Sequence, residues 1–275
     1  MFTNKELIRL ALEEDIGPGD VTTDALINKD RVATGVIFAK EPIIVAGLEV
    51  AQEVFTTLDP SMRFETGFQD GDRVESGDEI LTASGKLRAL LAGERTALNF
   101  LQRLSGIATL TRQYVDQVAG SNVRLTDTRK TTPGWRRLEK YAVKIGGGHN
   151  HRFGLYDAVL IKDNHIAACG GITEAVAKVR KSRPRLQIEV EVSDLDQVKE
   201  AIENRVDIIM LDNMETNDIR QAVRLVDHRA LIEVSGGVGL ERLAEIADIG
   251  VDIISIGALT HSARAVDISM KIAKS

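Results

Sequence analysis

After Val123 the sequence alternates between short β-branched runs and helical segments, and no other feature limits the possible folds as strongly. Six runs are typical of buried strands: VRLTDT, AVLIKD, IEVEV, DIIMLDN, LIEVSGG and DIISIGA. Amphipathic segments such as TEAVAKVRKS and LDQVKEAIENR lie between them. Repeated strand–helix alternation predicts parallel strands with helices packed on the sheet. The second part of the chain is therefore expected to form an α/β domain.

The number of strands helps to choose between two parallel folds. Six strands in about 150 residues are too few for a complete eight-stranded barrel, which needs about 250. Polar residues nevertheless follow the strands at their carboxyl ends, as they do at the rim of a barrel. We therefore predict an α/β fold with an incomplete (β/α) barrel of six to seven parallel strands. A doubly wound open sheet is the alternative, although no GxGxxG phosphate loop supports it.

The first third of the chain has a different pattern. The β-rich runs TGVIFAK and EPIIVAG precede a helical run from Leu48 to Leu58 and the turn-rich stretch DGDRVESGDEILTASG. From Lys86 to Val118, apolar residues recur at three and four positions, and Ser105-Gly106 predicts a break between two helices. We expect a small α+β sandwich domain at 1-110 and the barrel domain at 111-275, with a C-terminal helix that could pack back on the first domain.

Composition limits the kinds of partner. The net charge of -6 argues against broad binding of nucleic acid or anionic membranes. There is no run of about 18 apolar residues, and the first residues form an amphipathic stretch that contains acidic side chains. The single cysteine, Cys169, excludes an intramolecular disulfide. These features predict a cytoplasmic protein that binds neither nucleic acid nor membrane.

One segment departs from the acidic balance. Residues 121–165 contain nine Lys and Arg against four Asp and Glu, together with three of the five histidines. A local cationic excess of this kind predicts an anionic partner.

The candidate site residues share one position, the carboxyl end of a predicted strand. They are Asp127 to Lys130, Lys162 to His165, Glu191, Asp212-Asn213, Ser235-Gly236-Gly237 and Gly257-Ala258. A barrel rim collects side chains from strands far apart in the sequence, so these residues should converge on one pocket. Because the pocket would hold both cations and carboxylates, it is expected to bind a polyanion and a metal ion.

Period-two alternation in IEVEV places Glu189 and Glu191 on one strand face, pointing into the barrel. A buried carboxylate is costly unless a cation, hydrogen bonds or a metal ion compensates it, and Lys130, Lys162 or Mg²⁺ could do so. A purely structural ion pair is the alternative for Glu189. Asp212 ends the apolar run IIML at the mouth of the barrel, where it could bind a hard cation or a sugar hydroxyl, or cap a helix.

Glycine-rich turns follow the last two strands at Ser235-Gly236-Gly237 and Ser255-Ile256-Gly257. Backbone N–H groups without side-chain bulk can bind a phosphate there. The run GGGHNHR places three glycines before His149, His151 and Arg152, which predicts a loop that moves over a ligand. The two histidines could instead bind zinc, although the nearby arginines favour an anion site.

Taken in order, the motifs DTRKTTPG, YAVKIGGGHNHRFGLYDAVLIKDNH, EVEV, IIMLDN, VSGGV and SIGALTHS resemble the quinolinate phosphoribosyltransferase family, also called carboxylating nicotinate-nucleotide pyrophosphorylase. EEDIGPGDVTT and GERTALNFLQRLSGIAT extend the resemblance towards the front of the chain. It implies transfer of a phosphoribosyl group from phosphoribosyl pyrophosphate to quinolinate with decarboxylation. The products would be nicotinate mononucleotide, pyrophosphate and CO2, in NAD biosynthesis.

The resemblance also implies a role for each matching residue. Arg129, His151, Arg152 and Lys162 would hold the quinolinate carboxylates, and Lys130 would lie between the pyridine and the ribose. Glu191 and Asp212 would bind Mg²⁺ and the ribose hydroxyls, so that Lys130, Glu191 and Asp212 form the catalytic set. Ser235, Gly236, Gly237, Ser255 and Gly257 would hold the 5′-phosphate. Arg95 would enter the site of a neighbouring subunit, which implies a homodimer or a multiple of dimers.

Three other interpretations remain open from the sequence. A paralogue associated with molybdenum transport shares the fold and parts of the motifs and would use a different acceptor. A non-enzymatic nucleotide-binding module could use the same glycine turns, although the acidic pair argues against it. DGDRVESGDEILTASG also has the turn spacing of a biotin or lipoate carrier, but Lys86 is not in the modified-lysine context.

Overall fold

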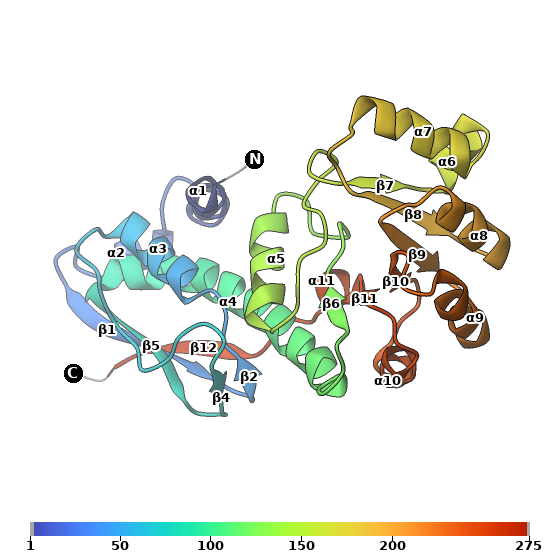
Figure 1. The fold of residues 1–275 in the computed structure, drawn as a ribbon. Coiled ribbons are helices and arrows are strands. Elements are labelled where there is room, and N and C mark those ends of the chain that lie inside the picture. The colour runs from blue at the N-terminus through green and yellow to red at the C-terminus, as the bar shows by residue number, and fades with distance from the viewer. Residues whose placement is uncertain (1–2, 274–275) are drawn as a thin grey trace. The chain divides into compact units, whose positions relative to one another are not determined.

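The computed structural model describes residues 3–273, which form two compact units (Figure 1). The first unit contains residues 3–112, 131–147 and 259–273 of the described chain, and the second contains 113–130 and 148–258. Two segments that follow residue 110 therefore belong to the first unit. The second unit holds the predicted barrel strands.

The first unit is built on an antiparallel sheet of four strands in the order β12-β1-β5-β3. Its described elements before the long helix are α1 (Asn4–Ile16), α2 (Val21–Leu26), β1 (Val32–Ala39), β2 (Ile43–Ile44), α3 (Leu48–Leu58), β3 (Arg63–Glu65), β4 (Arg73–Val74) and β5 (Glu79–Lys86). Helix α3 has the predicted bounds. Its buried side chains Val50, Val54 and Phe55 contribute to the core of this unit.

The predicted break at Ser105-Gly106 was wrong, because α4 runs without interruption from Leu87 to Gln117. Tertiary contacts explain why the helix has a serine and a glycine at these two positions. Buried Ser105 uses its Oγ to accept a hydrogen bond from the backbone N of Ala46 at 3.0 Å. A Cβ atom at position 106 would lie 2.0 Å from the carbonyl oxygen of Arg264, so the chain passes too closely for any other residue.

The expected C-terminal helix was also wrong, because this segment forms strand β12 (Ile268–Ile272). It pairs antiparallel with β1, from Gly35 opposite Ile272 to Ala39 opposite Ile268. Ile268 and Met270 alternate with more exposed residues, which is the pattern of a strand with one buried face. The segment does return to the first unit, as a sheet strand.

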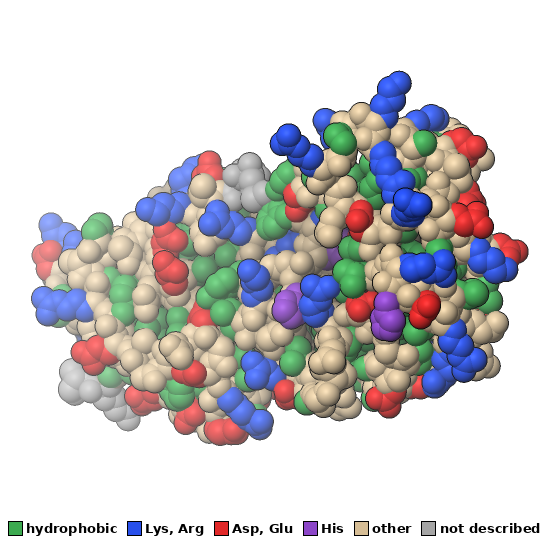
Figure 2. Space-filling model, in the orientation of Figure 1, with side chains coloured by type: hydrophobic (Ala, Val, Ile, Leu, Met, Phe, Trp, Pro, Cys, Tyr) green, Lys and Arg blue, Asp and Glu red, His purple; other side chains and the backbone are tan. Residues whose placement is uncertain are grey.

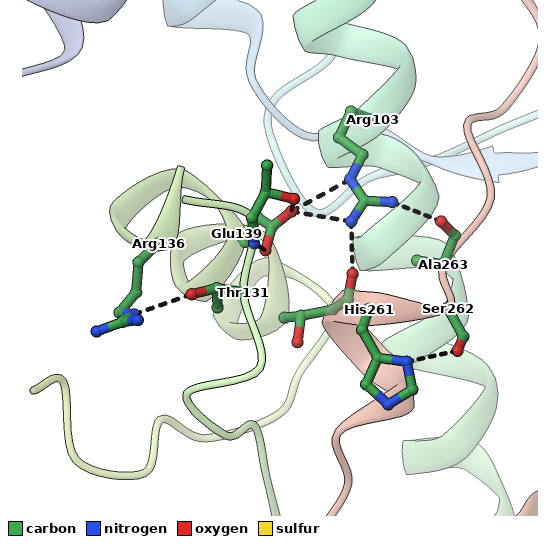
Figure 3. A network of polar contacts seen from close by, with 9 residues as sticks. Arg103, Thr131, Arg136, Glu139, His261, Ser262 and Ala263 are labelled. Carbon is green, nitrogen blue, oxygen red and sulfur yellow. Dashed lines mark hydrogen bonds and ion pairs between the residues drawn. The ribbon is translucent and has the colours of Figure 1, made fainter. Parts of the chain in front are cut away.

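A closed polar network joins the three segments of the first unit (Figure 3). Arg103 on α4 donates to Oε1 of Glu139 on α5 (Arg136–Ile145) at 2.9 Å, and to the carbonyl oxygens of Thr260 and Ala263. Glu139 is fully buried and also accepts hydrogen bonds from the backbone N and the Oγ1 of Thr132. These bonds explain why residues 131–147 and 259–273 belong with α4.

The second unit confirms the incomplete barrel. Its sheet order is β6-β11-β10-β9-β8-β7, and every neighbouring pair is parallel. The strands are β6 (Arg124–Thr126), β7 (Val159–Ile161), β8 (Ile188–Val192), β9 (Ile208–Asp212), β10 (Leu231–Ser235) and β11 (Ile253–Ser255). The described outer strands β6 and β7 do not pair with each other, although Thr126 forms an isolated bridge with His149.

Helices cover the outside of this curved sheet (Figure 1). They are α6 (Asp163–Cys169), α7 (Ile172–Ser182), α8 (Leu195–Glu203), α9 (Thr216–Val226) and α10 (Leu240–Asp248), and the short α11 (Ala258–His261) follows β11. On β10, Ile232 and Val234 alternate with Glu233 and Ser235, so the glutamate and the serine share the opposite face of the strand.

The surface drawn in Figure 2 intersperses cationic and anionic side chains, with hydrophobic side chains in small patches. Over the described residues, no helix has both the length and the apolar character that a bilayer span requires.

The close approach at Gly106 generates a prediction about stability. Alanine is favoured over glycine in a helix by about 1 kcal/mol, but a Cβ atom 2.0 Å from a backbone oxygen forces α4 away from the C-terminal segment. Gly106→Ala should therefore lower the free energy of unfolding by about 1–3 kcal/mol, measured by urea denaturation. Gly67→Ala is the control, because a Cβ at that exposed glycine would have nothing within 4 Å. Equal stability of the two variants would contradict the prediction.

Candidate active site

The barrel unit holds the predicted site residues, except Arg95, at the carboxyl ends of its strands and in adjoining loops. Arg129 and Lys130 follow β6, His151 and Arg152 precede β7, Lys162 follows β7, Glu191 lies in β8, Asp212 ends β9, Ser235 ends β10, and Ser255 ends β11. Gly236 and Gly237 follow β10, and Gly257 directly precedes α11. Arg95 is exposed on α4, in the first unit.

An ion pair joins Lys162 and Glu191. Nζ of Lys162 donates to Oε2 of Glu191 at 2.6 Å, and Glu191 is mostly buried, with 15% of its side chain exposed. The sequence had suggested Lys162 as a compensating cation for the inward carboxylates of β8. This pair places a cation and an acid side by side at the carboxyl ends of β7 and β8.

The second inward glutamate of β8 pairs with a histidine. Oε2 of Glu189 lies 3.2 Å from Nε2 of His151, and Glu189 is 4% exposed. On β10, Glu233 is fully buried, and its Oε1 lies 3.4 Å from the same nitrogen. Burial disfavours a charged imidazole, but the two carboxylates outweigh it and raise the pKa of His151 to about 10. The two acidic neighbours therefore favour the protonated form of the ring.

Sequence analysis missed Glu233. The signal was available, because LIEVS has the same period-two alternation as IEVEV and places Glu233 on the same face as Ser235. The sequence also could not show that residues of β8 and β10 meet at one ring, since β9 lies between them.

Asp127 holds the histidine-containing loop. Asn150 donates from Nδ2 to the buried Asp127 at 2.6 Å, and the backbone N of His151 donates to it at 2.9 Å. The backbone N of Asp127 donates in turn to the carbonyl of His149. The loop that follows the three glycines is thus fastened to β6, and its predicted movement over a ligand stays a prediction.

The structure does not bring His149 and His151 together as a pair of zinc ligands. Among the residues that the structure describes, the group with metal-ligand geometry is His151, Glu189 and Glu233, whose candidate ligand atoms lie within 4.8 Å of one another. His149 is not part of it.

Strand register aligns four polar residues in one row. Asp212 lies opposite Ser235, Ser235 opposite Ser255, and Ser255 opposite Thr126. Ser255 and Thr126 are buried, and their hydroxyl oxygens have no hydrogen-bond partner within the described part of the chain. The row combines a carboxylate with hydroxyl groups, which suits recognition of a polar ligand.

The turn after β10 requires glycine at position 236. Gly236 has φ +88°, and a Cβ there would lie 2.3 Å from Oδ1 of Asn213. Gly237 has φ +61°, and a Cβ there would have nothing within 4 Å. Asp212 accepts a hydrogen bond from Nδ2 of Asn213 at 2.8 Å, and the N-cap of the following helix α9 is Glu215. Asp212 is therefore not the helix cap that the sequence left open.

Two arginine side chains interact at the same end of the barrel. Burial, followed by the like charge of Arg129, lowers the pKa of the half-buried Arg152 guanidinium below its ordinary value. Two like charges held close together form a site that an anion would stabilise.

This chain is similar in sequence to one family over both of its domains. The family model "Quinolinate phosphoribosyl transferase, N-terminal domain" matches residues 20–105, and the corresponding C-terminal domain matches residues 107–271. A probable nicotinate-nucleotide pyrophosphorylase [carboxylating] from Bacillus subtilis is 44% identical over 98% of this chain and 93% of that protein. One from Synechocystis is 48% identical over 96% of this chain and 90% of that protein. The crystal structure of NadC from Streptococcus pyogenes matches 100% of this chain and 99% of its own, with 44% identity and a TM-score of 0.95. The chain belongs to the quinolinate phosphoribosyltransferase family.

Proposed function

We propose that this enzyme transfers a phosphoribosyl group from phosphoribosyl pyrophosphate to quinolinate with decarboxylation. The products are nicotinate mononucleotide, pyrophosphate and CO2, and the reaction belongs to NAD biosynthesis. The observation that carries this assignment is the match of both family domains over almost the whole chain. The named relatives do not support the alternative of a molybdenum-transport-associated paralogue with a different acceptor.

Quinolinate is a pyridine with two adjacent carboxylates, and the cations of the barrel suit it. Arg129, His151, Arg152 and Lys162 bind these carboxylates in the proposal. The planar guanidinium groups favour bidentate contacts with a carboxylate, while a lysine supplies a compact charge. The mutual repulsion that lowers the pKa of Arg152 is relieved when a dianion lies between the arginines.

Transfer begins when the pyridine nitrogen attacks the anomeric carbon of the ribose. The bond between that carbon and the pyrophosphate oxygen breaks, and pyrophosphate leaves with the electron pair, through an oxocarbenium-like state. Lys130, in the segment that follows β6, stabilises the negative charge that develops on the leaving group. The 5′-phosphate binds at Ser235, Gly236, Gly237, Ser255 and Gly257.

Decarboxylation follows from the charge that the first step creates. The ring nitrogen becomes positive, so the adjacent carbon–carboxylate bond can break while its electron pair stays beside that charge. CO2 leaves, and a proton is added to the same ring carbon. Lys130 is the proposed neighbour of that carbon.

Mg²⁺ is the proposed cofactor, held by Glu191 and Asp212. Carboxylate oxygens are the hard donors that Mg²⁺ prefers, so the chemistry of this pair fits the ion. Mg²⁺ is usually bound by one or two carboxylates together with substrate phosphates, so these two residues suffice when the phosphate-bearing substrate supplies further oxygens. The ion would neutralise the departing pyrophosphate.

We further propose that the active form is a homodimer or a multiple of dimers, in which Arg95 contacts quinolinate in the site of a neighbouring subunit. Arg95 and Asn99 are both exposed and lie four residues apart on α4, so they share one face of the helix. A cytoplasmic location is proposed as well, which suits a chain with one cysteine and no intramolecular disulfide.

Carbon dioxide release tests the function. With quinolinate labelled in its 2-carboxylate, we expect labelled CO2 and nicotinate mononucleotide in equal amounts, only when phosphoribosyl pyrophosphate and Mg²⁺ are both present. Nicotinate is the matched acceptor, because it lacks the adjacent carboxylate and cannot release CO2. Absence of CO2 release from quinolinate by the folded protein would refute the proposal.

Replacing Lys130 tests the mechanism. Because its charge acts mainly in the transition state, Lys130→Ala should lower kcat by about 10²–10³-fold and change the KM for quinolinate much less. Lys178→Ala, which removes an exposed lysine from α7, is the control and should leave both constants unchanged. Steady-state kinetics at saturating phosphoribosyl pyrophosphate measures kcat and the KM for quinolinate in both variants. Near-normal turnover of Lys130→Ala would exclude the proposed role.

A further inference from the structure

Glu233 is a buried carboxylate that the proposed mechanism does not use. It lies in the middle of β10, is 0% exposed, and neither of its carboxylate oxygens has a hydrogen-bond partner within residues 3–273. Its nearest cationic group is His151, with 3.4 Å between Oε1 and Nε2. An ionised carboxylate in such a place is costly unless a cation compensates it.

Glu189 approaches the same ring nitrogen from β8, at 3.2 Å. Two buried carboxylates on strands that flank β9 therefore converge on one imidazole. A neutral ring protonated at Nε2 could also face both acids, but two negative charges beside that nitrogen stabilise the positive charge of the doubly protonated ring. The convergence consequently favours the imidazolium over either neutral tautomer.

We propose that Glu233 is a positioning residue that acts together with Glu189 to keep His151 in the cationic form and orientation that bind a substrate carboxylate. This inference rests on the proposed function, in which His151 is a contact of quinolinate. Neither glutamate touches the reacting atoms, and both act through the ring of His151.

Other charged groups near His151 fix its main chain or change the pKa of its ring. Asp127, after β6, accepts the backbone N–H of His151 and so fixes its main chain. Arg152, next in sequence, and Arg129, which interacts with Arg152, are cations that favour loss of the histidine proton. The two carboxylates outweigh these cations and the burial of the ring, because they raise the pKa of His151 to about 10.

A divalent cation held by His151, Glu189 and Glu233 is the competing interpretation of this cluster. A metal ion needs a neutral imidazole as its ligand, so it would compete with the proton. The positive charges of Arg152 and Arg129 disfavour a second cation there. The geometry favours the proton, and the experiment includes the metal as an outcome.

Nitrogen NMR of the substrate-free enzyme, with ¹⁵N-labelled histidine, measures the charge of the ring directly. The chain has five histidines, and the signal that disappears in His151→Asn identifies His151. In the wild type both ring nitrogens should stay protonated up to about pH 10. In Glu233→Gln the ring should lose its proton at least about one pH unit lower, since one of its two partner charges is gone.

Glu245→Gln is the matched control, because it makes the same chemical change in the same unit at a side chain that is 51% exposed and pairs with Arg220. Its His151 signal should titrate as in the wild type. If Glu233→Gln does not fold, Glu189→Gln removes the other carboxylate and should lower the histidine pKa in the same direction.

Kinetics add a readout that a merely structural role would not move. For Glu233→Gln we expect the KM for quinolinate to rise at least about twofold at about pH 9, because a pKa one unit lower leaves about half of the rings uncharged there. The rise should be much smaller at about pH 6, where the ring is protonated in either enzyme. The KM for phosphoribosyl pyrophosphate should stay unchanged. A wild type that does not turn over quinolinate would refute the proposed function, whereas the NMR titration would still test the charge of the ring.

Three results would overturn the inference. One is a neutral His151 in the wild type at neutral pH, and another is a His151 titration that is the same in Glu233→Gln as in the wild type. The third is a shift of the His151 signal when Mg²⁺, Mn²⁺ or Zn²⁺ is added without substrate, if that shift is lost in Glu233→Gln. This last result would make the cluster a metal site.

Discussion

The need to compensate carboxylates inside an incomplete barrel determines much of the arrangement of the second unit. Barrel interiors are usually filled with branched apolar side chains. Here β8 and β10 contribute Glu189, Glu191 and Glu233 instead, and each has a cationic neighbour: Lys162 at Glu191, and His151 at the other two. Removing the partner of a buried acid such as Glu189 or Glu233 leaves an uncompensated buried charge, which typically costs about 3–5 kcal/mol. The cations proposed to bind substrate thus also compensate buried acids.

Much of the barrel could be predicted from the sequence, because its signals are local. Strand–helix alternation indicated six parallel strands, and all six runs form strands of one sheet. Period-two alternation also identified the inward direction of Glu189 and Glu191. The partner of Glu189 could not be predicted in the same way. His151 lies 38 positions away along the chain, and its contact depends on how Asp127 holds the loop after the three glycines.

The two errors in the first unit have a common origin. A break was expected at Ser105-Gly106 because glycine weakens helices, and a helix was expected at the C-terminus. Both expectations were wrong for one reason: the C-terminal segment returns to the first unit and packs there. The carbonyl of Arg264 occupies the space beside Gly106, and residues 268–272 pair with β1. Local propensity cannot foresee such a contact, because its partners lie more than 150 residues apart in the sequence.

The two units also compensate buried charge in physically different ways. In the first, Arg103 and Glu139 form a closed network in which the guanidinium bonds Glu139 and two carbonyls, and the carboxylate also accepts from Thr132 (Figure 3). A fully satisfied network of this kind makes a structure rigid and unique. In the barrel unit, Glu233 and the hydroxyls of Thr126 and Ser255 are buried without hydrogen-bond partners among the described residues. Buried polar groups of this kind can be satisfied by an ordered water molecule, an ion or a bound ligand. The contrast separates a network that holds the fold together from one that can still bind a ligand.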